Sequence, residues 1–329
     1  TMRLEKAEDG FAILTLDAEG SMNVVNDAFI ADMEAATKQI VVDESIKGVI
    51  LTSAKKTFMA GADLKQLVNG FGTLTPQEAY AFSKRATDMH RAIEQSGKPW
   101  VAAINGLALG GGFELALACH RRILADDAKA QVGLPEVNVG LLPGSGGTVR
   151  LGIIAGMKIA LDLLLSGRSV GPQEALKLKI VDEVVPADKL IDAAKAWLAT
   201  GPDPVKPWDV KGWTPPQKKG MTVPEDSAAY MMYTGGLAKG GYNQPAPAAI
   251  LNSVFHGLQL PFDKALAVEG KYFAKLLTDP VARNIIRTTF ISKQAAEKGA
   301  RRPEGFPKFE AKKVGVLGAG MMGAGIAFV

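Results

Sequence analysis

The sequence has few residues that could cross-link the chain or bind a metal ion. Its 329 residues include one cysteine, Cys119, which excludes an internal disulfide and is typical of a reducing compartment. Cys119 falls among apolar residues, so we interpret it as a packed side chain rather than a nucleophile. The three histidines, His90, His120 and His256, lack the spacing of metal ligands, and we predict no metal site.

Long apolar runs are also missing. No stretch reaches about 18 consecutive apolar residues, the length that predicts a transmembrane helix. The first residues, Thr1 to Glu5, carry charges and are not followed by the apolar segment of a signal peptide. We therefore expect no membrane insertion and a cytoplasmic location.

Charge of one sign does not accumulate anywhere. The 38 basic and 34 acidic residues give a formal charge of +4 and are mixed along the chain. Without a basic tract that could follow a phosphate backbone, nucleic acid is not an expected partner. The small excess is compatible with a phosphorylated small molecule, although a solvated surface is the simpler explanation. With 47% hydrophobic residues the chain can bury a large core, and its length predicts two domains.

Short β-rich runs alternate with helical patterns over roughly the first 190 residues, which predicts an α/β fold. The runs lie at 13–16, 48–52, 100–104 and 122–125. A first helix can be capped by Asn26 or Asp27. Its buried stripe is predicted to consist of Phe29, Met33, Ala36 and Ile40. A later helix is predicted from Asp188 to Leu198.

The composition changes after this helix. Five prolines and two tryptophans gather between residues 201 and 220, a mixture that predicts a connector packed along a surface. The pattern beyond it is helical. One helix is predicted from Pro261 to Leu277, and Asp279 and Pro280 begin another that runs toward Gly299.

The last residues have a different pattern. A strand is predicted over 313–317, and Gly318, Gly320 and Gly323 form the G-x-G-x-x-G motif of dinucleotide-binding proteins. The sequence given ends before the acidic residue that would bind a ribose. We therefore predict NAD binding only for a longer parent protein, and a helix-capping loop without a ligand is the working interpretation for this chain.

A run of three glycines, Gly110 to Gly112, separates the apolar run 100–104 from a helix that carries Glu114 in its first turn. Such a junction leaves backbone N–H groups unpaired at the positive end of the helix dipole, where they can stabilise an oxyanion. A second candidate acid, Glu136, follows. Oxyanion donors combined with two carboxyl groups indicate enolate chemistry with proton transfer.

A third segment, from Ala60 to Asp63, consists of small residues before an acid. Its backbone can approach a ligand closely and supply a second N–H donor opposite Gly111. Taken alone, the segment 60–63 is better explained as an ordinary loop in which Asp63 caps the next helix, and an isolated Pro-Glu at a helix start is more often structural, as Glu136 would then be. The stretch 142–147 is glycine-rich and predicts a tight turn beside the site.

Three motifs, at 60–63, 105–114 and 134–147, resemble those of the crotonase (enoyl-CoA hydratase/isomerase) family in order and spacing. The resemblance covers roughly the first 190 residues. It implies an α/β fold: a crotonase-type spiral of ββα units, a helical region, and the first βα unit of a truncated Rossmann domain. The implied domains are 1–190, 191–310 and 311–329. This order of segments is similar to the front half of bacterial multifunctional fatty-acid oxidation α subunits.

The resemblance assigns roles to the residues already singled out. It makes Glu114 and Glu136 the catalytic acids, and it makes the N–H groups of Ala62 and Gly111 the oxyanion hole for a thioester carbonyl. Further substrate contacts are expected at Ala60, Gly61, Asp63 and Gly110. The implied reaction is addition of water to 2-enoyl-CoA, with isomerisation of 3-enoyl-CoA as a second activity.

Hydration needs no cofactor beyond the coenzyme A of the substrate. NAD, bound through Gly318, Gly320 and Gly323, would belong to a 3-hydroxyacyl-CoA dehydrogenase in the parent protein. A thiolase subunit is a further expected partner. The alternatives are a crotonase relative that hydrolyses or decarboxylates thioesters, and a non-catalytic acyl-CoA scaffold that docks a thiolase.

Overall fold

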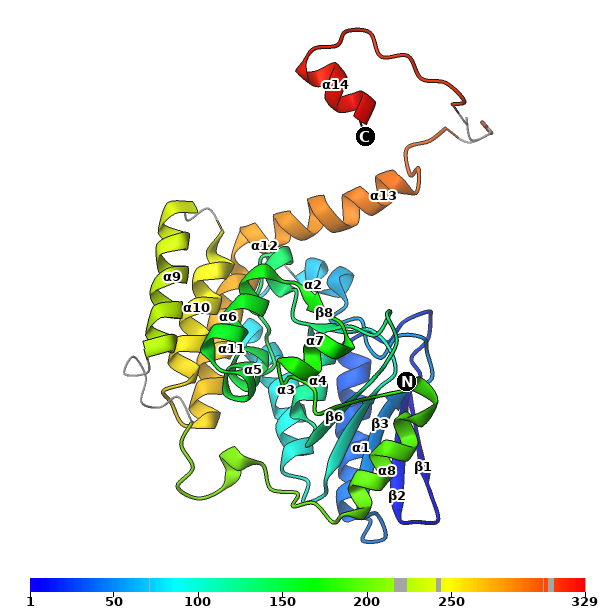
Figure 1. Cartoon of the computed structure of the whole chain (residues 1–329), viewed down its shortest axis with the longest axis vertical. Coiled ribbons are helices and arrows are strands. Elements are labelled where there is room, and N and C mark those ends of the chain that lie inside the picture. The colour runs from blue at the N-terminus through cyan, green and yellow to red at the C-terminus, as the bar shows by residue number, and fades with distance from the viewer. Residues whose placement is uncertain (71, 216–223, 241–243, 304, 307–310, 329) are drawn as a thin grey trace. The chain divides into compact units, whose positions relative to one another are not determined.

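The computed structural model places a six-stranded, mostly parallel sheet in the N-terminal part of the chain (Figure 1). The structure describes residues 1–70, 72–215, 224–240, 244–303, 305–306 and 311–328. Contacts divide the chain into two units, Thr1–Ile291 and Ser292–Val329. Residues 191–291 therefore pack with the first 190 residues, and the predicted family boundaries at 190 and 310 stay predictions.

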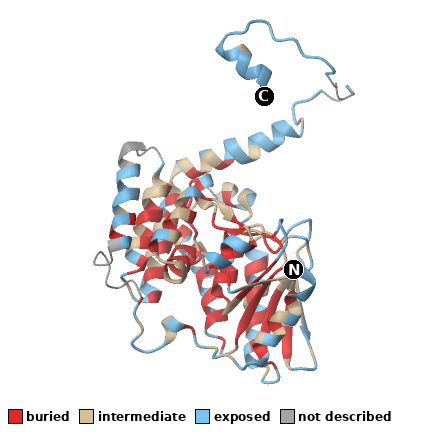
Figure 2. Ribbon diagram, in the orientation of Figure 1, coloured by how far each residue is buried: buried red, intermediate tan, exposed pale blue. Residues whose placement is uncertain are grey.

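The six-stranded sheet contains all four predicted β-rich runs, which confirms the α/β prediction. In sheet order its strands are β1 (Met2–Lys6), β2 (Phe11–Leu16), β3 (Gly48–Ser53), β4 (Trp100–Ile104), β6 (Arg121–Ala125) and β9 (Glu183–Val185). Only the β1–β2 pair is antiparallel. Every residue of β4 is buried, as expected of a parallel strand covered on both faces. Figure 2 shows the central strands in the colour of buried residues.

Helix α1 (Asp27–Val42) begins as predicted. The Asn26 side chain accepts a hydrogen bond from the N–H of Phe29, and the predicted stripe is buried. Helix α8 (Leu190–Ala199) follows the last strand of the sheet in the chain and contacts β3, β4 and β6. It is preceded by the 3₁₀ turn η2 (Ala187–Lys189). Helix α3 (Pro76–Glu94) packs against α1.

A second, three-stranded sheet was not predicted, because two-residue strands leave no periodic signal. It consists of β5 (Ala108–Leu109), β7 (Val132–Gly133) and β8 (Ser169–Val170). Strand β5 follows β4 and precedes α4 (Gly111–Ala118) in the chain. Its residue Ala108 forms a parallel bridge with Met59. The shorter elements around this sheet are α2 (Leu64–Gly70), η1 (Glu136–Val139), α5 (Gly147–Ala155), α6 (Met157–Ser166) and α7 (Pro172–Lys177).

The region after residue 201 is helical, as predicted. It contains η3 (Pro207–Asp209), α9 (Pro224–Gly240), α10 (Pro245–Gly257), α11 (Phe262–Thr278) and α12 (Pro280–Ile285). Asp279 caps α12 by accepting from the N–H of Val281. The chain continues as a π-helix, η5 (Ile286–Ser292), and as α13 (Lys293–Glu297), so the predicted helix toward Gly299 changes its winding. Helix α11 contacts α3, α5, α10 and α12.

The tryptophans of the connector pack, as predicted. Trp208 stacks on Phe262 of α11 with ring centroids 4.6 Å apart and an interplanar angle of 12°. Trp213 meets Trp208 edge to face at 6.4 Å. Both rings lie against an apolar cluster that includes Val149 and Ala265. The predicted connector residues 216–220 lie outside the described part of the chain.

The second unit lacks the predicted strand. Residues 313–317 form no strand in the structure, because no other strand within the described residues of this unit offers its N–H and C=O groups for pairing. The glycine-rich turn and the helix do form. Gly318 has φ +97°, and α14 (Met321–Phe328) follows. The assignment of this unit to a Rossmann domain stays a prediction.

A buried network of charges joins the sheet domain to the helical region. The Arg150 Nε donates to Glu94 Oε1 over 2.7 Å, and both side chains are fully buried. At the edge of this network, Arg91 contacts Glu94 over 2.6 Å, Asp209, and the exposed Asp263 over 3.0 Å. Burial alone would raise the pKa of Glu94, but the charge and hydrogen bonds of Arg150 hold it at about 2.

Replacing Arg150 with methionine should leave Glu94 buried without its main partner. We expect a loss of about 3–5 kcal/mol in the free energy of unfolding, measured by urea denaturation at neutral pH. The control, Arg168→Met, removes ion pairs of an exposed arginine and should lose about 1 kcal/mol or less. Equal losses in the two variants would contradict the prediction. Because the pKa of Glu94 is lowered in the folded state, its stabilisation should fade as pH falls from 4.5 toward about 2.

Candidate active site

The three glycines occupy a position that excludes side chains. Gly110 has φ +53° and precedes α4, and the N–H of Glu114 donates to its carbonyl. A Cβ atom added to Gly112 would lie 2.7 Å from both the Cβ and the carbonyl oxygen of Met59. A Cβ atom on Gly110 would lie 3.7 Å from the Cα of Gly61. The glycines therefore let α4 begin directly against the segment 59–63.

Glu114 is buried at 3% exposure and is held by three donors. Its Oε1 accepts from the N–H of Ser145 and of Gly147, each over 2.8 Å, and its Oε2 accepts from the Ser145 hydroxyl over 2.7 Å. Burial raises the pKa of the Glu114 carboxyl, against the effect of these hydrogen bonds, which lower it. The predicted turn at 142–147 therefore supplies the donors that fix this acid.

Glu136 begins η1, and its carboxyl group lies beside Gly110. A Cβ atom added to Gly110 would be 2.8 Å from Glu136 Oε1. Glu136 Oε2 is buried and has no hydrogen-bond partner among the described residues. Burial, and next the charge of Glu114, raise the pKa of Glu136 well above its usual value. The structure thus brings the two predicted acids together and leaves one with an open acceptor.

Ala62 and Gly111, the two predicted oxyanion donors, both lie beside Val25. Val25 donates to the Gly61 carbonyl over 2.8 Å and accepts from the N–H of Asp63 over 3.1 Å. In this parallel bridge the N–H of Ala62 points away from Val25. Gly111 packs on the same valine, since an added Cβ atom would lie 3.0 Å from Val25 Cγ2. Gly111 opens α4, where an N–H group has no partner within the helix.

The remaining predicted contacts have structural partners. The N–H of Ala60 donates to the Asn23 carbonyl over 2.9 Å. Asp63 Oδ1 accepts from the N–H groups of Lys65 and Gln66, so the side chain caps α2. Asn23, which the sequence did not single out, donates to the Phe58 carbonyl over 3.0 Å and holds the start of this segment. Substrate contact by Asp63 stays a prediction.

A third buried carboxyl group, Glu269 of α11, was missed. It lies 1% exposed, and its oxygens accept hydrogen bonds from the N–H groups of Gly146 and Thr148. The signal was present in the sequence. Glu269 falls in the apolar stripe of α11, whose other buried members include Phe262, Leu266, Phe273 and Leu276. An acid at a core position of an amphipathic helix indicates a buried partner.

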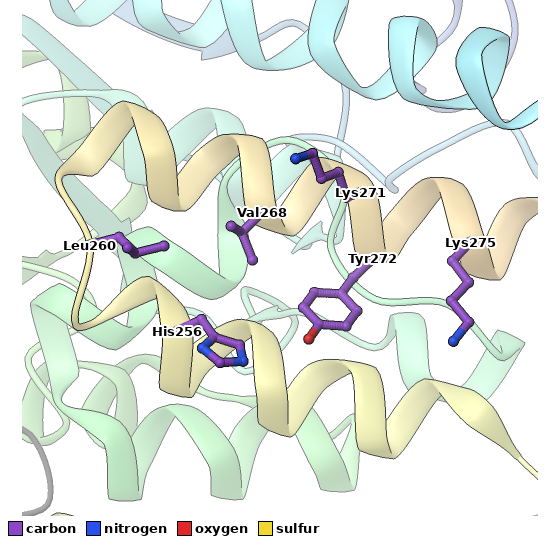
Figure 3. Close-up of a pocket in the computed structure, with 6 residues that line it drawn as sticks. All are labelled: His256, Leu260, Val268, Lys271, Tyr272 and Lys275. Atoms are coloured by element: carbon purple, nitrogen blue, oxygen red, sulfur yellow. The ribbon is translucent and has the colours of Figure 1, made fainter.

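Two surface hollows lie away from these acids. One of about 440 Å³ lies between α10 and α11 and is lined by His256, Leu260, Val268, Lys271, Tyr272 and Lys275 (Figure 3). The other, of about 320 Å³, lies between α3 and α11 and includes Ser83, Thr87 and Arg91. Neither contains a predicted site residue.

The glycine motif of the second unit is a separate feature. A Cβ atom on Gly323 would lie 1.8 Å from the Gly318 carbonyl oxygen, so the loop closes tightly on the start of α14. Gly320 has open space around it. Within the described residues, no group of three His, Cys, Asp or Glu side chains could hold a metal ion. Over the same residues no helix is long and apolar enough to cross a membrane.

The arrangement at α4 and η1 can perform acid–base chemistry. The neighbouring carboxyl groups of Glu114 and Glu136, whose pKa values are both raised, share a proton more readily than they ionise together, so one proton remains available to a substrate atom. Stabilisation of a developing oxyanion by the N–H groups of Ala62 and Gly111 stays a prediction. These groups together suit addition or removal of a proton beside a carbonyl group.

Comparison with known proteins places this site in a family context. Residues 6–201 match the family described as Enoyl-CoA hydratase/isomerase. The fatty acid oxidation complex subunit alpha of Shewanella amazonensis is 37% identical over 334 residues, which cover 100% of this chain and 46% of that protein. The subunit of Shewanella sp. (strain MR-4) is 38% identical with the same coverage. The chain thus spans about half the length of these curated relatives.

Solved structures show the same fold. The enoyl-CoA hydratase of Bacillus anthracis is 25% identical, with a TM-score of 0.56 over 91% of this chain and 96% of that one. Human mitochondrial delta3-delta2-enoyl-CoA isomerase is 22% identical, with a TM-score of 0.64 over 91% and 99%. These likenesses confirm the crotonase-type fold that the three motifs predicted. The chain belongs to the enoyl-CoA hydratase/isomerase family.

Proposed function

We propose that this chain adds water to the double bond of 2-enoyl-CoA in fatty-acid β-oxidation. The observation that supports the proposal most strongly is the pair of neighbouring acids at the start of α4, the buried Glu114 held by three donors and Glu136 with a buried, unpartnered oxygen. The substrate thioester oxygen would accept from the N–H groups of Ala62 and Gly111. These donors stabilise the enolate charge that forms when water attacks C3.

The two acids take different parts in this mechanism. Glu114, fixed by Ser145 and Gly147, orients the water and removes its proton as the hydroxyl group bonds to C3. Glu136, whose raised pKa favours the protonated form, delivers a proton to C2. The proton taken from water and the proton given to carbon balance, so the pair can return to its starting state by exchange between the acids.

Isomerisation is the second candidate activity. The same acids could move a proton from C4 to C2 of a 3-enoyl-CoA, since both steps pass through an enolate held by the same donors. The likeness of the fold to human mitochondrial delta3-delta2-enoyl-CoA isomerase supports this candidate. Thioester hydrolysis and a silent scaffold, the alternatives from the sequence, would give a free acid or no product.

For a longer parent protein, further functions follow from the relatives. Their printed name, fatty acid oxidation complex subunit alpha, supports an assembly that acts on acyl-CoA. We propose that the parent also binds NAD through Gly318, Gly320 and Gly323 as a 3-hydroxyacyl-CoA dehydrogenase. A thiolase partner and a cytoplasmic location remain part of this proposal.

Replacing either acid with its amide tests the assigned roles. Glu114→Gln and Glu136→Gln should each lower the rate of crotonyl-CoA hydration by about 10²-fold or more, because general acid–base catalysis contributes about that much. Loss of the enoyl thioester is followed by absorbance, and binding of the CoA ester by calorimetry should persist. The control Glu174→Gln changes an exposed glutamate paired with Arg168 and should leave the rate unchanged. Near-normal turnover in Glu114→Gln or Glu136→Gln would refute the mechanism.

The position of Gly110 permits a matched test of the site's geometry. Gly110→Ala forces a side chain to within 2.8 Å of Glu136 Oε1 at φ +53°. We expect kcat to fall about 10²-fold, since misplacing a catalytic group by about 1 Å has that effect. Gly20→Ala introduces comparable backbone strain at φ +86° with nothing within 4 Å, and should lose stability only. Equal kcat values in the two variants would rule out the proposed crowding.

The pH dependence of hydration should reflect the paired acids. Since burial raises the pKa of both carboxyl groups, one proton should remain on the pair at neutral pH, and kcat/KM should fall as rising pH removes it. In Glu136→Gln the residual activity should lack this alkaline limb. A limb that persists unchanged in that variant would assign the titration to another group.

A further inference from the structure

We infer that Glu269 is a positioning residue for the catalytic acid Glu114, and that helix α11 therefore contributes to the geometry of the active site. The inference rests on the proposed hydratase function for its kinetic readout. Its structural basis is independent, because it concerns how one carboxyl group fixes the loop that holds another. The residues involved are Glu114 on α4, Glu269 on α11, and the loop 144–148 between them.

The loop donates to the two acids in alternation. The N–H groups of Ser145 and Gly147 donate to Glu114 Oε1 over 2.8 Å each. The N–H of Gly146 donates to Glu269 Oε1, and the N–H of Thr148 donates to Glu269 Oε2 over 2.8 Å. Four successive amides thus alternate between two carboxyl groups. The backbone of this loop cannot shift toward one acid without lengthening its bonds to the other.

Glu269 also replaces the local cap of α5. The N-cap of that helix is Gly146, which has no side chain to accept its first N–H groups. Glu269 accepts from the N–H groups of Gly146, Thr148 and Val149 and from the Thr148 hydroxyl, although Gly146 lies 123 residues earlier in the chain. A serine or aspartate at the cap would satisfy the same groups locally. Because Glu269 belongs to α11, it also fixes the position of α5 and its loop relative to α11, which a local cap would not do.

Neighbouring residues close the loop from the same direction. Phe273, one turn after Glu269, packs on Gly144, where an added Cβ atom would lie 2.6 Å from the ring. The Ser145 carbonyl accepts from Arg150 over 3.0 Å and contacts His90 over 3.0 Å. Ala282 of α12 lies against Gly140, the residue that ends η1. Helix α11 therefore contacts the loop that holds Glu114, and α12 contacts the end of the turn that carries Glu136.

The charges around Glu269 provide a readout that a structural role would not change. Glu114 and Glu136 face it, as does Arg150. Burial raises the pKa of Glu269 to about 8, and the charge of Glu114 adds to the rise. As pH rises through this value, an ionised Glu269 opposes loss of the proton held by the two catalytic acids. Removing its charge should therefore make that proton leave at lower pH.

The test compares Glu269→Gln with the wild-type chain. We expect kcat for crotonyl-CoA hydration to fall about 10- to 10²-fold with KM changed less than about threefold, because the acid is misplaced while substrate contacts remain. The alkaline limb of the pH profile should move to lower pH by about half a unit or more. Amide hydrogen exchange should accelerate at Ser145 and Gly147, which donate to Glu114, as well as at Gly146 and Thr148.

Two further variants separate positioning from folding. Glu269→Asp keeps the charge but withdraws it by about one bond length of 1.5 Å, so kcat should fall while the alkaline limb stays near its wild-type position. Asp263→Asn makes the same acid-to-amide change at an exposed residue of α11 and should leave kcat and exchange at the loop unchanged. Thermal unfolding of each variant shows whether it is folded at the assay temperature.

Each result decides the inference. It is overturned if folded Glu269→Gln keeps kcat within about twofold and exchange at Ser145 and Gly147 is unchanged. If Glu269→Gln does not fold, the aspartate variant takes its place, and normal kcat in that variant overturns the inference too. Failure of both to fold shows a folding residue instead. If the wild-type chain has no hydratase activity but Glu269→Gln accelerates amide hydrogen exchange at Ser145, the proposed function is refuted while the positioning role is retained.

Discussion

Burying carboxyl groups is the constraint on which this structure depends. Glu114, Glu136 and Glu269 are brought to one region without a lysine or arginine bound directly to any of them in the described residues. Desolvation of an unpaired carboxylate is expensive, and backbone amides are the compensation that the fold provides. The loop 144–148 exists in this position because its amides must meet two acids at once.

The glycines follow from the same constraint. Amides can reach a carboxylate only if side chains do not stand between them. A Cβ atom on Gly147 would lie 2.8 Å from Glu114 Oε1, and one on Gly110 the same distance from Glu136 Oε1. In this chain, Gly110 and Gly147 therefore mark the positions where an acid oxygen lies against the backbone. The backbone amides meet the acids at the start of α4, whereas the other buried residues of this helix are apolar.

Local patterns carried most of the information that could be predicted from the sequence. Four of the strands, the stripe of α1 and the packing of the tryptophan-containing connector were visible in period and composition, and the motifs around Glu114 and Glu136 identified the family. The two-residue strands were not visible, because they are formed by pairing with distant segments. The strand at 313–317 had the right pattern but lacks a partner to pair with in the described residues. The apolar stripe of α11 indicated that Glu269 is buried, but it could not identify the partners Gly146 and Thr148, which lie 123 and 121 residues earlier.

The distance of 123 residues between Gly146 and Glu269 has a consequence for biosynthesis. During synthesis from the N-terminus, the turn beside Glu114 gains all of its hydrogen bonds only after α11 has been made. The family match ends earlier, at residue 201. The nascent protein would contain every strand of the sheet before the turn beside Glu114 has all of its hydrogen bonds. The contacts that hold this turn therefore extend beyond the boundary of the family match.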